Sequence, residues 1–178
     1  MKDLLIANRY AQALVRTIPK EEYDSLLQDV KALQKQFTDL PELGKYLNSR
    51  IVDREERKEV VNMLVSGLNH QKKWYNLYVL MEKKHRMTQV EKILFETEKI
   101  VLDLQDKKKM TLTLARKHSD SVVKSIVDYV STTVGKELVI EQEIDPEIIG
   151  GFIAKVGSTN IDGSIKSKLS QLEKVTDN

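Results

Sequence analysis

The sequence of 178 residues contains no cysteine, three prolines and seven glycines, and it has no long apolar run. The absence of cysteine excludes disulfides, thiolate nucleophiles and thiolate metal sites, and it fits a reducing compartment. No apolar run approaches the roughly 20 residues that span a bilayer. The opening residues, MKDLLIANRYAQALV, carry an acidic and several polar side chains, which argue against a signal peptide or a transit peptide. We therefore expect no direct membrane insertion.

An excess of charge of one sign is missing as well, because 29 basic residues stand against 27 acidic residues. A nucleic-acid-binding face needs a local basic excess, so we expect no nucleic acid as a partner. The run Lys107–Lys109 is the exception, and it could attract nucleic acid or anionic lipid. Asp103 and Asp106 lie beside it in the sequence. The mixture of three lysines with two neighbouring aspartates favours a solvated linker over a binding site.

Patterns of catalytic or cofactor-binding residues are also lacking. His70, His85 and His118 stand singly, and none is paired with another ligand at metal-binding spacing. The glycines of VGSTNIDGS and of the Gly150-Gly151 pair match no phosphate-binding loop. The serines near Asp162 have no neighbouring histidine to act as a base. We predict no metal, no cofactor, no catalytic residue and no enzymatic activity.

Apolar residues recur at three- and four-residue spacing through the first 104 residues, which predicts a series of helices. Pro19 and Pro41 are expected to end the first two of them. Asp53 and Glu56 have the spacing of a capping box at the start of a later helix. The expected helical segments cover residues 3–18, 23–37, 43–47, 54–68, 73–82 and 90–104.

Two of these helices carry more apolar surface than one packing partner needs. The apolar arc of the first spans roughly 200°, whereas one partner requires a stripe of about 100°. The segment WYNLYVLM leaves almost no polar face for two turns. Each helix therefore either lies deep in a bundle or is shared with a partner protein, and the residues alone leave both readings open.

After residue 109 the spacing becomes mixed, so we place a domain boundary near residues 105–110. Alternating residues predict strands at 110–114, 138–144 and 152–156. Between the first two strands, Ser119 or Asp120 can begin a helix and Gly135 can end it. Ser164 can cap a last helix that carries Leu169, Leu172 and Val175. This order describes a small α/β domain.

Four of the seven glycines lie in the stretch from Ile144 to Leu169, at 150, 151, 157 and 163. Such a concentration marks turns, positive φ angles or close backbone approach. The Asp162-Gly163 pair is expected to form a turn before the last helix. The alternative is a surface hairpin with no role beyond folding.

Two motifs resemble those of the delta subunit of bacterial F-type ATP synthase, a relative of the mitochondrial oligomycin-sensitivity-conferring protein. NRYAQALV resembles the opening helix of that family, and IDPEIIGGFIAKVGSTNIDGSIKSKLSQL resembles its signature near the C-terminus. Lysines at 166 and 168 stand where the family usually has arginines. The signature and structural positions are Asp145, Gly150, Gly151, Ile161, Asp162, Gly163, Ser164 and Leu169.

The resemblance implies a mainly α fold, with an N-terminal six-helix bundle at 1–106 and a small α/β domain at 107–178. It implies a non-catalytic stator subunit of the proton-translocating synthase, present in one copy per complex. The bundle would bind N-termini of the alpha subunits, and the C-terminal domain would bind the C-termini of the b subunits. The protein would then lie at the cytoplasmic face of the bacterial plasma membrane as a peripheral component.

In that family the partner helix lies against the first and fifth helices of the bundle. These are the two helices with surplus apolar surface in this sequence, so we expect recognition of a helix in a groove. The positions that the resemblance assigns to this groove are Ala7, Tyr10, Ala11 and Leu14 on the first helix, and Trp74, Leu77, Tyr78 and Met81 on the fifth.

Overall fold

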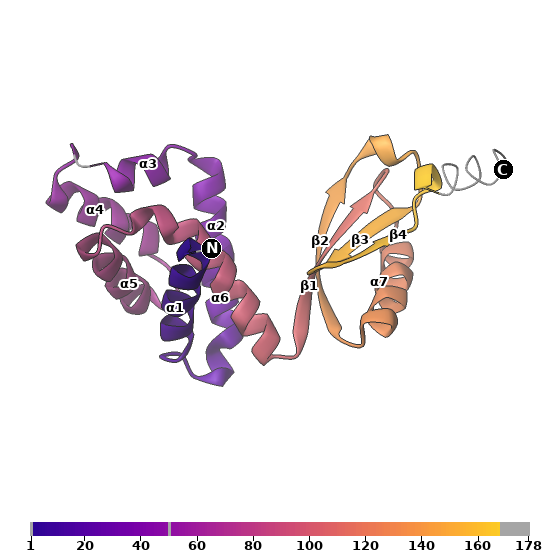
Figure 1. Ribbon diagram of the computed structural model, residues 1–178, viewed down its shortest axis with the longest axis horizontal. Helices are drawn as coiled ribbons and strands as arrows, with labels where there is room; N and C mark the ends of the chain where they lie inside the picture. Colours follow the sequence, from indigo (N-terminus) through magenta and orange to yellow (C-terminus); the bar gives the residue numbers. More distant parts are fainter. Residues whose placement is uncertain (1, 50, 168–178) are drawn as a thin grey trace. The chain divides into compact units, whose positions relative to one another are not determined.

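The computed structural model describes residues 2–49 and 51–167, and within them the chain is mainly helical with one small four-stranded sheet (Figure 1). The chain divides into two compact units, residues 1–101 and residues 102–178. None of the described helices combines the length and the apolar character that crossing a membrane requires.

The first unit is built from α-helices and two short 3₁₀ turns. Each expected helical segment is present, including the short one after Pro41. Its elements are α1 (Lys2–Val15), η1 (Lys20–Glu22), α2 (Tyr23–Asp39), α3 (Leu43–Asn48), α4 (Arg54–Val65), α5 (Gln71–Lys83), η2 (Met87–Gln89) and the greater part of α6 (Val90–Leu104).

Local signals account for the helix ends, with two departures from expectation. Helix α1 ends at Val15, one turn earlier than expected, and the Thr17 hydroxyl donates to the Leu14 carbonyl at 2.7 Å. Asp53 caps α4 as expected by accepting from the Glu55 amide at 2.9 Å, and this bond lowers the pKa of Asp53. Glu56 does not complete a capping box, because its carboxylate accepts from the Tyr46 hydroxyl at 2.7 Å instead.

The core of the first unit contains a buried polar cluster among aliphatic and aromatic side chains. Leu26, Leu33 and Trp74 are almost completely buried in this core. The cluster centres on Asp29 of α2, whose carboxylate accepts hydrogen bonds from the segment that begins α5. It therefore joins α2 to the start of α5.

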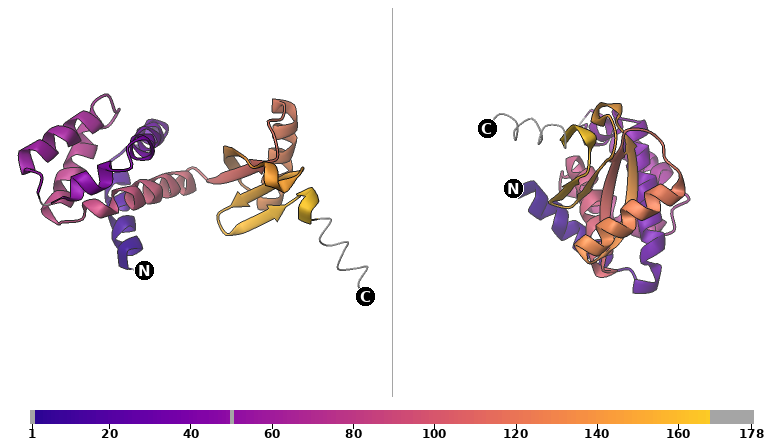
Figure 2. Two further views of the ribbon diagram at one scale, coloured as in Figure 1. Left: turned by 90° about the horizontal axis from the view of Figure 1, so that it is seen from above. Right: turned by 90° about the vertical axis from the view of Figure 1, so that its right-hand side faces the viewer.

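The second unit is a sheet with one described helix packed on one face (Figure 2). The strand order is β2-β1-β3-β4, in which β1 and β2 are parallel and the other two pairs are antiparallel. Gly135 ends α7 with a φ of 72°, as expected. The elements are β1 (Lys107–Leu114), α7 (Asp120–Val134), β2 (Glu137–Ile144), η3 (Pro146–Ile148), β3 (Phe152–Val156) and β4 (Thr159–Asp162).

The structure corrects two expectations for this unit. Lys107–Lys109 is the start of β1 rather than a solvated linker, and it pairs with β2. Lys107 lies 3.5 Å from Glu137 and Lys109 lies 3.1 Å from Glu141, so these lysines are partly neutralised. Strand β4 was not expected either, because the polar sequence TNID has no apolar alternation.

Candidate partner-binding site

Helices α1 and α5 pack against each other in the first unit (Figure 1). Two polar contacts tie them and the following turn together. The Lys73 ammonium donates to the Thr17 carbonyl at 2.7 Å, and the Arg86 guanidinium donates to the Tyr10 hydroxyl at 3.1 Å. The same guanidinium lies 5.7 Å from the centroid of the Tyr10 ring. Polar contacts therefore hold the α1–α5 seam at two points.

The residues assigned to the groove lie mostly inside the first unit. Tyr10 is the only one of the eight that is half-buried rather than buried. Contact of a partner with the other seven stays a prediction, because in this chain they fill the core beneath the seam. The buried seven are Ala7, Ala11, Leu14, Trp74, Leu77, Tyr78 and Met81.

The rim of the seam consists of Tyr10 and of half-buried or exposed residues that the groove assignment did not include. Ile6 and Ala13 lie about one helical turn on either side of Tyr10, and Ala13 is exposed. Leu80 lies two helical turns after Lys73, whose ammonium contacts the turn just after α1, so it lies on the same side of α5, and it is 46% exposed. In the sequence, these positions were indicated by the apolar arcs of the first and fifth helices, which are wider than one packing partner requires. Together with Tyr10 they give a partner helix apolar atoms to cover.

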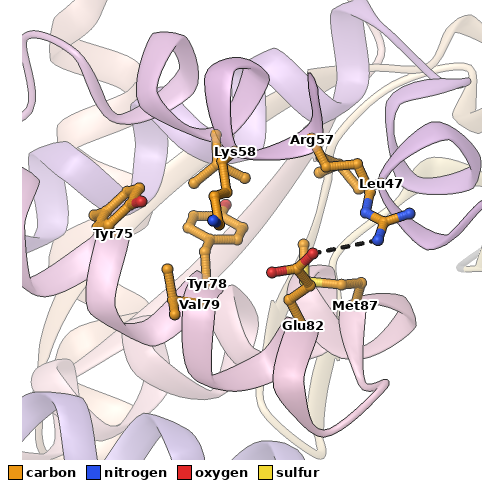
Figure 3. A pocket seen from close by; sticks show the side chains of 9 residues that line it. Leu47, Arg57, Lys58, Tyr75, Tyr78, Val79, Glu82 and Met87 are labelled. Atoms are coloured by element: carbon orange, nitrogen blue, oxygen red, sulfur yellow. Dashed lines mark hydrogen bonds and ion pairs between the residues drawn. The ribbon is translucent and has the colours of Figure 1, made fainter. Parts of the chain in front are cut away.

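Tyr78 faces away from this rim, toward α4. Its side chain points into a small cavity that is lined by Arg57 and Lys58 of α4 and by Val79 and Glu82 of α5, among others (Figure 3). Arg57 donates to Glu82 at 3.2 Å across the cavity. The Tyr78 hydroxyl has no hydrogen-bond partner in the part of the chain that the structure describes, and burial raises its pKa. Tyr78 therefore belongs to the α4–α5 contact.

The residues with potential for other chemistry do not converge. His70 is buried against Asp29, His85 is exposed, and His118 is half-buried on another element. Within residues 2–49 and 51–167, no three His, Cys, Asp or Glu side chains form a group that could hold a metal ion.

The signature residues of the second unit join the loop before β3 to the beginning of the last helix. The Ile165 amide donates to the Gly150 carbonyl, and the Gly163 amide donates to the Phe152 carbonyl, both at 2.9 Å. Gly151 has a φ of 82°, and a Cβ at this position would overlap the Gly163 carbonyl oxygen. A Cβ at Gly163 would in turn lie 2.9 Å from the Phe152 ring. The glycines therefore allow two backbone segments to touch.

The remaining signature residues complete this junction with hydrogen bonds from side chains. Asp145 caps η3 by accepting from the Glu147 amide, and Asp162 accepts from the Ser164 amide, both at 2.9 Å. Ser164 caps the last helix as expected, since its hydroxyl accepts from the Ser167 amide at 3.2 Å. Ile161 packs against the core of the unit. Leu169, Leu172 and Val175 lie outside the described residues.

Comparison with known proteins identifies the family. A sequence profile described as ATP synthase delta (OSCP) subunit matches residues 6–175. The chain belongs to this family. The resemblance that the two motifs predicted is thereby confirmed, and it extends through the middle of the chain.

Relatives in the ATP synthase delta family match over nearly their whole length. An ATP synthase subunit delta from Desulfosudis oleivorans is 30% identical over 177 residues, which cover 97% of this chain and 95% of the relative. One from Fuscovulum blasticum is 29% identical over 170 residues, which cover 94% and 91%. Such subunits are structural components of the synthase and not its catalytic ones.

The fold is also found in a solved ATP synthase. A chain in the cryo-EM structure of the Toxoplasma gondii mitochondrial ATP synthase hexamer superimposes with a TM-score of 0.73 at 15% sequence identity, and 97% of each chain is covered. The likeness in fold therefore covers residues of both units of this chain.

Proposed function

We propose that this chain is the stator subunit that clamps the catalytic head of a proton-translocating F-type ATP synthase to the membrane-anchored b subunits. Membership of the delta (OSCP) family over residues 6–175 is the observation that carries the proposal. In this proposal an N-terminal six-helix bundle at 1–106, which includes the first unit, binds N-termini of the alpha subunits. The C-terminal domain at 107–178 binds the C-termini of the b subunits.

The proposed mechanism is mechanical. The torque that the rotor exerts would turn the catalytic head unless a peripheral stalk held it still. The stator subunit transmits this torque from the head to the stalk and makes or breaks no covalent bond. One copy per complex, placed peripherally at the cytoplasmic face of the bacterial plasma membrane, fulfils this role.

The α1–α5 seam is the proposed site for the head. An amphipathic helix from an alpha subunit lies along the seam and covers the rim that Ile6, Tyr10, Ala13 and Leu80 form. Burial of apolar surface drives the association, at about 25 cal/mol per Å² removed from water. The buried residues beneath the rim, such as Trp74 and Met81, set the distance between α1 and α5 and so the width of the surface that the partner helix contacts.

Leu80→Asp is expected to weaken binding of a peptide from the N-terminus of the alpha subunit at least tenfold, or about 1.4 kcal/mol. The reason is that a charge replaces an apolar side chain that is 46% exposed and that the partner would bury. Isothermal titration calorimetry with the full chain measures the change.

Two variants serve as controls for Leu80→Asp. Met63→Asp makes a comparable change on α4, where Met63 is 67% exposed, and the affinity should stay within twofold. Tyr78→Phe keeps the aromatic ring and removes only a hydroxyl that points toward α4, so it should also leave the affinity unchanged. Unaltered binding by Leu80→Asp, or equal losses at positions 63 and 80, would show that the seam is not the site.

A further inference from the structure

Strand β2 forms one outer edge of the sheet in the second unit. It pairs along its whole length of eight residues with β1, and no other described strand lies on its far side. In a parallel pair, alternate residues direct their amide and carbonyl groups to the neighbouring strand and the others direct theirs outward. Half of the backbone groups of β2 are therefore available at this edge. The opposite edge, β4, is half as long.

The apolar layer beneath α7 continues past β1 onto β2. Met110 and Leu114 of β1 are buried against α7, and the register places Ile140 and Ile144 of β2 directly beside them. Ile140 is nevertheless 39% exposed and Ile144 is 53% exposed. Because directly opposed residues lie on the same face, these two isoleucines form an uncovered margin of the apolar layer.

The other face of β2 is acidic along the same edge. Glu141 and Glu143 are both exposed, and the register places them beside Thr111 and Thr113. Glu141 is paired with Lys109 at 3.1 Å, whereas no cation pairs with Glu143 within the part of the chain that the structure describes. The edge therefore offers apolar side chains on one face and negative charge on the other.

Natural proteins usually protect exposed edge strands with charged side chains, lysine above all, or with proline, bulges or short length. Strand β2 has no proline or lysine, and its register with β1 is continuous without a bulge. A strand of this kind is suited to accept another extended segment through main-chain hydrogen bonds, with alternate side chains determining specificity.

We infer that the β2 edge binds an extended segment of a partner protein as a fifth strand. The segment alternates apolar residues, which extend the layer at Ile140 and Ile144, with lysine or arginine residues, which oppose Glu141 and Glu143. A second copy of the chain fits poorly, because two β2 edges would place these glutamates against each other. This inference rests on the proposed function, which supplies the segment from the C-terminal part of a b subunit.

Amide hydrogen exchange, followed by NMR on the full chain with and without the soluble part of the b subunit, tests the inference. Bound b subunit should slow exchange at least tenfold at alternate residues of β2, because their outward amides acquire partners. Glu143→Lys should weaken b binding at least tenfold. Asp128→Lys makes the same change of charge on the exposed side of α7 and should leave binding within twofold.

The outcomes separate the inference from the proposed function. Binding of the b subunit without slower exchange in β2 would overturn the inference alone. Absence of b binding by the unmodified chain would overturn the stalk contact and the inference with it. If protection of the β2 amides increases with the concentration of the chain in the absence of the b subunit, the occupant is a second copy. This result would also overturn the inference.

Discussion

Asp29→Ala is expected to lower the free energy of unfolding of the first unit by about 3 to 5 kcal/mol, because it leaves several buried donors unpaired. Asp29 is 1% exposed, and its carboxylate accepts from the backbone amides of Asn69 and His70 at 2.8 and 2.9 Å. The Asn69 side-chain amide, the His70 ring and the Trp74 indole nitrogen lie 2.9, 2.9 and 3.2 Å from it. No alanine side chain can replace these interactions.

Denaturant unfolding followed by the fluorescence of Trp74, the only tryptophan, measures this change. Gln28→Ala is the matched control, because Gln28 precedes Asp29 on α2 and is exposed. It should change the stability by less than about 0.5 kcal/mol. A loss below about 1 kcal/mol for Asp29→Ala would contradict the view that this cluster anchors α2 to the start of α5.

Gly151→Ala is expected to destabilise the second unit by about 2 to 4 kcal/mol, through backbone strain and a steric clash together. Gly151 has a φ of 82°, which a residue with a Cβ rarely adopts. A Cβ at this position would overlap the Gly163 carbonyl oxygen and would lie 3.0 Å from the Ser164 Cα. Both obstacles are backbone atoms, so relief requires the junction itself to open.

Gly157→Ala separates the two contributions. Gly157 also has a positive φ, of 59°, but a Cβ there would meet no atom within 4 Å. This control should cost only about 1 to 2 kcal/mol, the strain of the left-handed conformation. Protection of the β3 amides from hydrogen exchange reports the stability of the unit. Equal losses for the two variants would refute the packing role of the glycine junction.

Much of the fold was predictable because local chemistry determines it. The three- and four-residue spacing identified the helices, and Asp53 and Gly135 occupy the expected cap positions. Strand β4 was missed because its stability comes from pairing with β3, and its own residues lack apolar alternation. The lysine run was misread because its acidic partners, Glu137 and Glu141, lie about 30 residues away in the sequence.

Which apolar side chains of a helix the protein itself buries was less predictable than the fold. A wide apolar arc shows that a helix has much to bury, but it cannot show which part of the arc the protein itself covers. Tyr78 illustrates this limit, because its hydroxyl turns toward α4 (Figure 3). Leu80 stays exposed, although the same wide arc includes it. The contact between His70 and Asp29, which are 41 residues apart, left no local pattern in the sequence.

Reconstitution tests the central proposal most directly. ATP synthase membranes depleted of their delta subunit are supplied with this chain, and both retention of the catalytic head and ATP synthesis driven by a proton gradient are measured. We predict that the chain restores both retention of the head and ATP synthesis at about one copy per complex. If neither returns, while the original delta subunit restores both in the same membranes, the chain is not the stator clamp.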